Sequence, residues 1–385
     1  MKNKIAIASA FLAASSFSMG EIVLNEFVSV EGFVDSSYSH NQSDIAGTKE
    51  STNSFGIDQV EIDWLFSFGN VSAQVDLEYE EGVNGTNVEQ AFVNFERANG
   101  DVVTAGRYAS MLGFEAFEPT GLYQFSLAYD FSGILGDANT IIQAIPGANA
   151  APGDFANDFP ITTSNIGNEV GALAAQNYVQ GVKYTRTTDT SFFGISLQDQ
   201  SFGNDGDRLG GDTEGDSSHA VEVAGSLDLG NGFSVFAGGS FEDAESGDNQ
   251  LINTYVTYET GAWLFAAEVN ISESEDVVLN IGLNPVIPQQ RTTTGDVDGL
   301  GYMLMANYAY SDVASVTARI SSQDFDASGV DLEMFKYTLA HLYAFSDNLA
   351  LCVEVSQSDI DLDIDGILDE DGDNLGFAVE LLFSF

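Results

Sequence analysis

Basic residues are scarce in this chain. Its 385 residues include 11 Lys and Arg against 59 Asp and Glu, which gives a formal net charge of −48. Nucleic-acid-binding proteins present a basic surface to the phosphates, so this class is excluded. A charge of this sign repels anions and concentrates cations near the protein. Adaptation of the surface to brine explains the composition equally well, and the two explanations are compatible.

Cysteine and long apolar runs are also scarce. Cys352 is the only cysteine, which excludes an intramolecular disulfide and a thiolate metal cluster. The apolar stretch over residues 5–14 is far shorter than the ~20 residues that a membrane-spanning helix needs, and no later stretch reaches that length. Helical membrane spans are therefore excluded. A membrane β-barrel is not excluded, because its lipid-facing and lumen-facing residues alternate and average out.

The two ends of the chain carry complementary signals. The basic start with Lys2 and Lys4, the short apolar stretch and the small residues after it predict a signal peptide over 1–20, cut after Gly20, with Ser18 as the alternative. The last segment alternates apolar and polar residues and ends on Phe385. Together the two ends indicate an exported chain that closes a β-barrel in the outer membrane of a Gram-negative-type cell.

Glycine and aromatic residues are abundant, with 39 Gly, 28 Phe and 14 Tyr, as suits many strands and tight turns. In the segment 55–69, for example, Ile62 and Trp64 share one face while Glu61 and Asp63 share the other. Sixteen such segments are present, at 26–40, 55–69, 70–81, 87–98, 100–110, 177–187, 190–202, 218–229, 232–243, 249–260, 262–273, 298–311, 313–324, 331–345, 348–360 and 374–385.

The connections between these segments alternate in length. The short turns are Gly69-Asn70, Asn99-Gly100, Thr188-Asp189, Gly230-Asn231, Thr260-Gly261, Ser311-Asp312 and Ser346-Asp347. The longer, acidic connections are 41–54, 82–86, 111–176, 203–217, 244–248, 274–297, 325–330 and 361–373. Short periplasmic turns and long outer loops are typical of bacterial outer-membrane barrels. The sequence therefore predicts an all-β fold: one transmembrane antiparallel β-barrel domain over 21–385, with about 16 strands and with 14 or 18 as alternatives.

One connection, 111–176, is much longer than the others and is rich in Ala, Gly, Asn and Pro. Long segments of this kind in compact domains are usually functional. A 16-stranded barrel leaves an aqueous channel, so we expect this third outer loop to fold into the lumen as a constriction. The alternatives are a cap outside the barrel, or two extra strands that would raise the count to 18.

Two neighbouring motifs lead to a resemblance. Val88-Glu-Gln-Ala-Phe-Val-Asn-Phe is followed by Val103-Thr-Ala-Gly-Arg107-Tyr-Ala-Ser-Met-Leu-Gly113-Phe-Glu115. This stretch resembles the OmpL-like β-barrel porins, and the whole architecture is similar to the general 16-stranded bacterial porins. The resemblance implies a diffusion channel for small polar solutes and ions, a homotrimer, contact with outer-membrane lipid, and insertion by the barrel assembly machinery. The chain departs from the general porins in having few basic residues for a cationic wall opposite the loop.

Strand alternation assigns charged side chains to the lumen. The basic residues with lumen parity are Arg107, Lys183, Arg319 and Lys336, and Glu115, Glu118 and Asp130 lie on the candidate constriction loop. These seven are the predicted constriction residues. The predicted acidic wall consists of Glu31, Asp35, Glu61, Asp63, Asp76, Glu78 and Glu354. Opposed charges across a narrow pore create a transverse field, and rings of Asp and Glu favour cations. Alternatively, the basic residues pair with loop carboxylates and fix the loop in place.

Aromatic residues at strand ends are expected to form interfacial girdles. They are Tyr38, Phe68, Tyr108, Tyr184, Tyr258, Trp263, Tyr310, Tyr343, Phe345 and Phe385.

Asp361, Asp363 and Asp365 before Gly366 are similar to the start of a calcium loop, but Gly372 stands where a bidentate Glu is needed. No cofactor is therefore predicted. Loose calcium binding at the outer loops remains a weak alternative to a solvated acidic loop.

A hydrolase is not expected, because His40 and His219 adjoin Ser39 and Ser218 on strands, where neighbours point to opposite faces. The sequence instead predicts a non-enzymatic outer-membrane porin for passive, cation-preferring diffusion of small hydrophilic solutes. The alternatives are a substrate-selective channel with a ligand site at 111–176, and a non-conducting structural or adhesion barrel.

Overall fold

The computed structural model describes most of the chain after the predicted signal peptide, of which it describes Gly20 alone. The described residues are 20–45, 47–80, 86–115, 118–131, 177–202, 219–244, 247–281, 291–327, 329–364 and 368–385. Among these residues no helix has the length and apolar character needed to cross a membrane.

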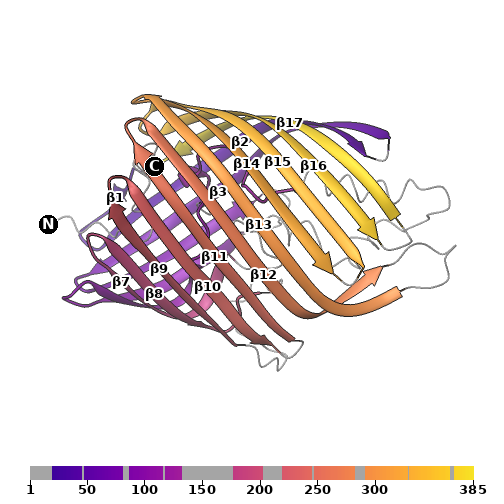
Figure 1. The fold of residues 1–385 in the computed structure, drawn as a ribbon. Helices are drawn as coiled ribbons and strands as arrows, with labels where there is room; N and C mark the ends of the chain where they lie inside the picture. The colour runs from indigo at the N-terminus through magenta and orange to yellow at the C-terminus, as the bar shows by residue number, and fades with distance from the viewer. Residues whose placement is uncertain are drawn as a thin grey trace.

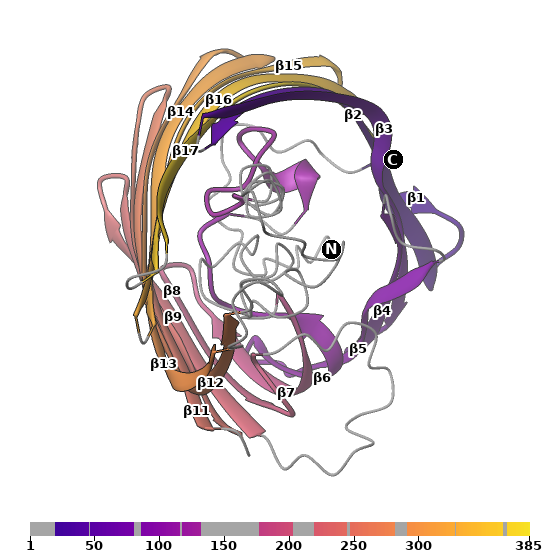
Figure 2. The same cartoon turned by 90° about the vertical axis from the view of Figure 1, so that its right-hand side faces the viewer.

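Sixteen strands form a single antiparallel sheet that closes on itself (Figures 1 and 2). They are β2 (Val28–Ile45), β3 (Thr48–Phe68), β4 (Val71–Glu80), β5 (Asn87–Glu96), β6 (Asp101–Ala109), β7 (Tyr178–Thr187), β8 (Ser191–Gln198), β9 (His219–Gly230), β10 (Phe233–Ala244), β11 (Gly247–Thr260), β12 (Trp263–Ile281), β13 (Arg291–Ser311), β14 (Ala314–Ala327), β15 (Val330–Ser346), β16 (Leu349–Ile364) and β17 (Leu368–Ser384). A two-residue strand, β1 (Ile22–Val23), pairs with β2, and the described residues also include one short 3-10 helix, η1 (Pro119–Gly121). The predicted all-β barrel of 16 strands is confirmed.

The ring is closed by the pairing of β17 with β2, in which Phe383 faces Val34 and Ala378 faces Ser39. Phe385 extends this seam beyond the last strand, since its N–H donates to the Gly32 carbonyl and its carbonyl accepts from the Gly32 N–H, both at 2.9 Å. Closure gives each of these sixteen strands a ladder partner on both sides, which is the condition for placing a sheet in a bilayer.

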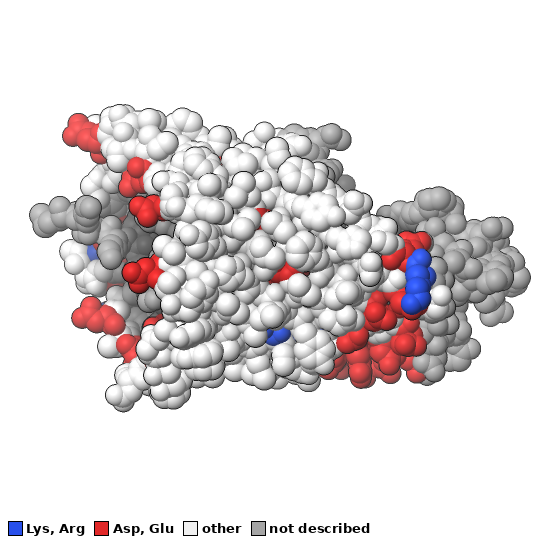
Figure 3. All heavy atoms as spheres, turned by 90° about the horizontal axis from the view of Figure 1, so that it is seen from above, with Lys and Arg blue, Asp and Glu red and all other residues white. Residues whose placement is uncertain are grey.

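Alternation along the strands separates an apolar outer surface from a polar interior. On β3, Ile62 and Trp64 are 38% and 36% exposed, whereas Glu61 and Asp63 are each 3% exposed. On the face shown in Figure 3, acidic side chains gather toward the two ends, and the broad band between them contains few charges. The interior is polar because side chains there face water or the third loop instead of hydrocarbon.

The short turns lie where the sequence predicts them. Gly69, Gly230 and Gly261 have φ angles of 76°, 78° and 61°, and Asn231 has a φ of 57°. Such left-handed conformations suit Gly and Asn, so these residues allow neighbouring strands to reverse within two residues.

The predicted outer loops 41–54, 274–297 and 361–373 are wrong, because the strands continue through most of these residues. The β2–β3 hairpin extends to Ile45 and Thr48, and β16 and β17 continue to Ile364 and from Leu368. Figure 1 shows these long hairpins projecting at the end away from β1 and the C-terminus. Beyond the hydrocarbon both faces of a strand meet water, so the ladder continues without the apolar alternation that predicted it.

Aromatic rings gather near the short turns, as expected for an interfacial girdle. Phe233 stacks on Tyr258 with ring centroids 4.1 Å apart, and Trp263 stacks on Tyr308 at 4.5 Å. Tyr108 was expected in this girdle but is buried on the lumen side, at 1% exposure. Its hydroxyl lies 2.8 Å from the Ser196 hydroxyl, and this part of the prediction is therefore wrong.

Gly106 on β6 allows the close approach of β5 and β6 to be tested. It has a φ of 132°, and a Cβ at this position would lie 2.2 Å from the Ala91 carbonyl oxygen of β5. Gly69 also has a positive φ, but no atom lies within 4 Å of its Cβ position. We expect Gly106→Asn to destabilise the barrel by about 2 kcal/mol or more, because it adds a backbone clash to the strained conformation.

The measurement is the thermal midpoint of the loss of heat-modifiable migration on a gel. Gly69→Asn is the matched control, since Asn tolerates the left-handed conformation. Equal midpoints for the two variants would contradict the close approach of β5 and β6.

Candidate functional site: the constriction loop and the charged lumen

The described part of the third loop leaves β6 at Ser110 and lies inside the barrel. Figure 2 shows its described part, with the short helical ribbon of η1, within the ring of strands. The predicted fold of the loop into the lumen is thus confirmed for residues 110–115 and 118–131, whereas 116–117 and 132–176 lie outside the described residues. We call residues 110–131 the constriction loop.

Glu222 of β9 anchors the first turn of the constriction loop. Its two carboxylate oxygens accept hydrogen bonds from the Met111 N–H at 2.8 Å and from the Ser110 hydroxyl at 2.7 Å. Met111 and Leu112 then pack into an apolar cluster with wall residues that include Phe236. An interior carboxylate therefore satisfies loop donors, which a buried loop requires.

A second wall carboxylate, Glu268 of β12, holds the next turn. It accepts from the Phe114 N–H at 2.8 Å and from the Tyr129 hydroxyl at 3.2 Å. Asn253 of β11 donates to the same carboxylate at 2.7 Å and accepts from the Gly113 N–H at 3.1 Å. Phe114, near the start of the constriction loop, and Tyr129, near the end of its described part, therefore meet at the Glu268 side chain.

Arg319 of β14 forms a buried ion pair with Glu115 of the loop, and both side chains are almost completely inaccessible. The second Glu115 oxygen accepts from the Ala128 N–H at 2.6 Å. Arg319 also donates to the Ser126 carbonyl at 2.8 Å. The pair is thus surrounded by further hydrogen bonds, the condition under which a buried pair offsets its desolvation.

The other predicted basic residues of the lumen also contact main-chain oxygens. The Lys336 ammonium donates to the carbonyls of Asp130 and Leu127 at 2.8 and 3.2 Å. The Lys183 ammonium donates to the Ala109 carbonyl at 3.1 Å and lies 4.3 Å from the centre of the Tyr108 ring. Lys336 thus contacts the constriction loop through main-chain carbonyls and not through the carboxylates that the alternative names, and Lys183 contacts the last residue of β6.

Arg107 does not take the lumen position that the sequence assigned to it. Arg107 pairs with Ala91 of β5, and Ala91 pairs with Val75 of β4, which pairs with Trp64 of β3. Because Trp64 is exposed on the outer face, Arg107 lies on that face as well. Tyr108 takes the lumen position instead, opposite Val179. The Arg107 Nε donates to the Glu89 carbonyl at 2.7 Å, so the residue still contacts the wall next to the acidic residues.

The predicted acidic residues all lie on the lumen face. Asp35, Glu61, Asp63, Asp76, Glu78 and Glu354 are buried there, and Glu31 is half-buried opposite Asp63. Glu354 accepts from the hydroxyl and the N–H of Ser126 at 2.7 and 3.2 Å, so it also holds the constriction loop.

Several lumen carboxylates were missed by the sequence analysis, namely Glu89, Glu222, Glu268 and Glu380. Glu380 pairs with Cys352 beside the apolar outward residues Val379 and Leu381. The same alternation that indicated Glu354 would have found it. Glu89 gives no such signal, because a register shift after Asp76 leaves it without a partner on β4.

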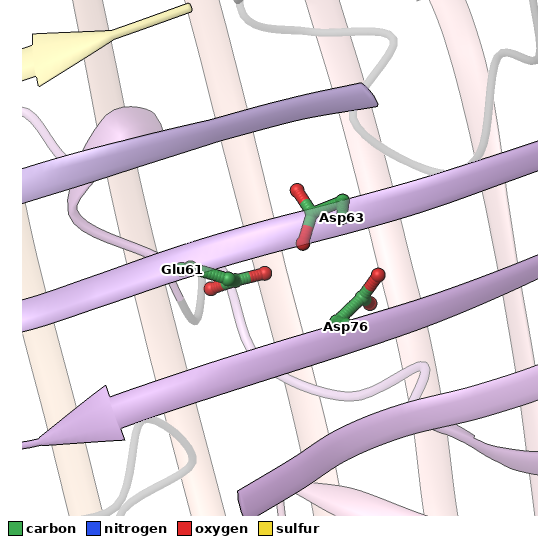
Figure 4. Close-up of side chains that lie close together, drawn as sticks. All are labelled: Glu61, Asp63 and Asp76. Carbon is green, nitrogen blue, oxygen red and sulfur yellow. The ribbon is translucent and has the colours of Figure 1, made fainter. Parts of the chain in front are cut away.

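Carboxylates gather most densely on β3, β4 and β5. Glu61, Asp63 and Asp76 point toward one another (Figure 4), and Glu61 also lies close to Glu89 and to Glu118 of the constriction loop. We call these five residues the acidic cluster.

Amide and hydroxyl groups of the wall orient two members of the cluster. Gln90 and Gln74 donate to one oxygen of Asp76 at 2.8 and 2.9 Å. Tyr178 donates to Glu118 at 2.6 Å, and Gln59 does so at 3.2 Å.

The constriction loop therefore crosses the lumen. Glu115 is paired with Arg319 on β14, whereas Glu118, three residues later, contacts Gln59 on β3 and Tyr178 on β7. In the ring order β14 lies far from both of these strands. The chain then returns, because Thr317 of β14 donates to the Tyr123 carbonyl at 2.9 Å. A segment that spans the channel in this way narrows it.

The predicted metal residues lie apart from this cluster. Asp361 and Asp363 are on β16, in ladder positions opposite Asp371 and Asp369 of β17, and Asp365 lies outside the described residues. An extended strand does not wrap an ion as a calcium loop does. Among the described residues, neither aspartate joins a group of three carboxylates close enough to share an ion. Most of the predicted acidic loop 361–373 thus belongs to β16 and β17, and the prediction of a loop there is wrong.

The same architecture occurs in solved structures of outer-membrane proteins. OmpT of Vibrio cholerae matches with a TM-score of 0.54 at 11% identity, over 95% of this chain and 100% of that chain. The outer membrane channel DcaP of Acinetobacter baumannii matches with a TM-score of 0.57 at 10% identity, over 93% and 97%. Salmonella typhi OmpF in complex with daunomycin matches with a TM-score of 0.54 at 13% identity, over 95% and 100%.

The chain has the fold of an outer-membrane porin. No protein-family model matches the sequence, and no curated protein matches it either. At these identities the likeness establishes the porin fold alone. The role of the lumen must be argued from its own residues.

The ion pair of Arg319 and Glu115 gives a sharp test of how the loop is held. Arg319→Gln leaves Glu115 buried without its cation, which costs about 3–5 kcal/mol. We expect a lower thermal midpoint and faster cleavage of the constriction loop by added protease. Adding Glu115→Gln to this variant should restore most of the loss, because both charges are then gone.

Lys49→Gln is the control, since Lys49 forms an exposed ion pair with Asp44 at 2.8 Å, and no measurable change is expected there. A double variant no better than Arg319→Gln alone would show that the pair is not what holds the loop.

Proposed function

We propose that this protein is a passive channel of the outer membrane for small hydrophilic solutes, with a preference for cations. The observation that carries the proposal is the crossing of the lumen by the constriction loop, which brings Glu118 to the acidic wall of β3, β4 and β5. Solutes too large for the space beside the loop are excluded, and the charge around that space biases which ions enter.

Charge pairing supports the cation preference. The basic side chains of the lumen, Arg319, Lys336 and Lys183, are engaged by the constriction loop or by the main chain at its start. The constriction loop brings no Lys or Arg to the acidic cluster, and the loop residue that joins the cluster, Glu118, is itself acidic. A water-filled passage next to these groups has a negative potential, which raises the local concentration of cations.

The predicted signal peptide over 1–20 supports export to the outer membrane as part of this proposal. A homotrimer is proposed as well, since a solved structure of Vibrio cholerae OmpT is described as a trimer form and matches with a TM-score of 0.52 over 93% of this chain. The predicted partners, outer-membrane lipid and the barrel assembly machinery, follow from the same placement.

Conductance in planar bilayers tests the channel. We expect single-channel steps of uniform size, and a reversal potential of cation-selective sign under a salt gradient in the presence of chelator. Selectivity should weaken at high salt, because the Debye length falls to about 3 Å at 1 M. Folded protein without conductance would refute the channel, and an anion-selective potential would refute the cation preference.

Glu118 is the residue whose charge should matter most for selectivity. Removing one charge about 8 Å from a permeating ion changes its energy by roughly 0.5 kcal/mol in water, so Glu118→Gln should lower the cation-to-anion permeability ratio about twofold. Asp243→Asn is the control, because Asp243 is 73% exposed on β10. If both variants shift the reversal potential equally, the acidic cluster does not set the selectivity.

A further inference from the structure

The acidic cluster consists of two carboxylate triads that share one residue. In the first, one oxygen each of Glu61, Asp63 and Asp76 lie within 4.8 Å of one another. In the second, the same holds for Glu61, Glu89 and Glu118. The ladder explains the first triad, because Asp63 faces Asp76 directly across β3 and β4, and Glu61 is two residues away on the same face.

Four carboxylate oxygens of this cluster are buried and accept no hydrogen bond. They are Glu61 Oε2, Asp63 Oδ1, Asp76 Oδ1 and Glu89 Oε2. The exposure of the four residues is between 0% and 7%. A buried carboxylate oxygen is costly unless it meets a donor or a cation, so each of these oxygens indicates a missing partner.

The wall orients Asp76 in particular. Gln74 and Gln90 both donate to its Oδ2, which leaves Oδ1 as the unpaired oxygen. In Figure 4 the Asp76 side chain on β4 and the Asp63 and Glu61 side chains on β3 converge on the space between the strands. The two amides therefore hold one ligand of the triad in place, as outer-shell groups do at metal sites.

Basic side chains of the described residues do not neutralise the cluster. None of the ion pairs among them includes a carboxylate of the cluster. Arg107 on neighbouring β6 directs its Nε to the Glu89 carbonyl oxygen, at 2.7 Å. Like charges this close, and shielded from water, repel strongly, and either a cation among them or a proton on one of them relieves the repulsion.

We propose that Glu61, Asp63 and Asp76 bind one divalent cation of the hard, oxygen-preferring class, and specifically Ca²⁺. Three carboxylates from two strands match its preference for several oxygen ligands in a flexible geometry, with water completing the shell. Mg²⁺ demands a stricter octahedron, which side chains fixed by a β-ladder are less suited to form. Through Glu61 the ion also lies next to Glu118, so its binding steadies the crossing of the constriction loop.

Calcium binding is tested by calorimetry on the folded, chelator-washed protein in detergent. Calcium chloride is the titrant, in enough sodium chloride to screen diffuse binding to this acidic chain. We expect one saturable site per chain in the wild type. Asp63→Asn with Asp76→Asn should weaken that site at least tenfold, because the ion loses two of its three charged ligands.

The matched control is Asp361→Asn with Asp363→Asn, which removes the same charge from exposed positions on β16. It should keep the site. The proposal is overturned if the wild type shows no saturable binding, if the Asp63/Asp76 variant binds as the wild type does, or if the control loses the site to the same extent. Displacement of the bound calcium by equimolar Mg²⁺ would overturn the assignment to Ca²⁺.

Glu61→Gln is the second variant, for the case in which the double variant does not fold, and heat-modifiable migration reports folding for each. Binding itself does not depend on conduction, whereas an effect of the ion on selectivity rests on the proposed function. Calcium should lower the cation selectivity of the wild type and leave that of the Asp63/Asp76 variant unchanged. A barrel that conducts without a calcium site contradicts this inference alone, and one that binds calcium without conducting contradicts the channel alone.

Discussion

The closed main-chain ladder is the constraint on which the other features depend. In hydrocarbon each unpaired N–H or carbonyl is costly, so the sheet must meet itself, and the β17–β2 seam with the Phe385 and Gly32 hydrogen bonds achieves this. Closure in turn gives every strand an inner and an outer face. The closed ring contains sixteen strands, which enclose a space wide enough to admit a folded loop.

That loop is held chiefly by charged side chains of the wall. Glu222, Glu268 and Glu354 accept loop donors, while Arg319 and Lys336 satisfy loop acceptors. Main-chain groups of a buried segment need such partners, and the wall supplies them from strands as far apart in sequence as β9 and β16. Arg319 and Lys336 are engaged with the loop, so the charged groups of the lumen that are left without a basic partner among the described residues include the carboxylates of the acidic cluster. The way the loop is held is therefore linked to the cation preference that we propose.

Sequence patterns failed where the alternation loses contrast. Above the hydrocarbon, β2 and β3 continue through polar residues such as Asn41 and Thr52, which pair in the ladder although nothing apolar marks their face. On β6, the neighbouring residues Val102 and Val103 are both apolar. The sequence therefore does not show which residues of this strand face the lipid and which face the lumen. Strand alternation assigned Arg107 to the lumen, whereas the ladder gives that side to Tyr108.

The sequence by itself determined a strand number close to sixteen, the short turns and the apolar outer face, because each depends on local alternation and on Gly or Asn at the reversals. It also determined that Glu61, Asp63 and Asp76 face the lumen. Only the tertiary structure decided that these three carboxylates meet, that Glu118 joins them across the channel, and that Glu115 pairs with Arg319. Those contacts depend on the register between strands and on the path of a loop through the lumen, which join residues far apart in the chain and leave no local pattern.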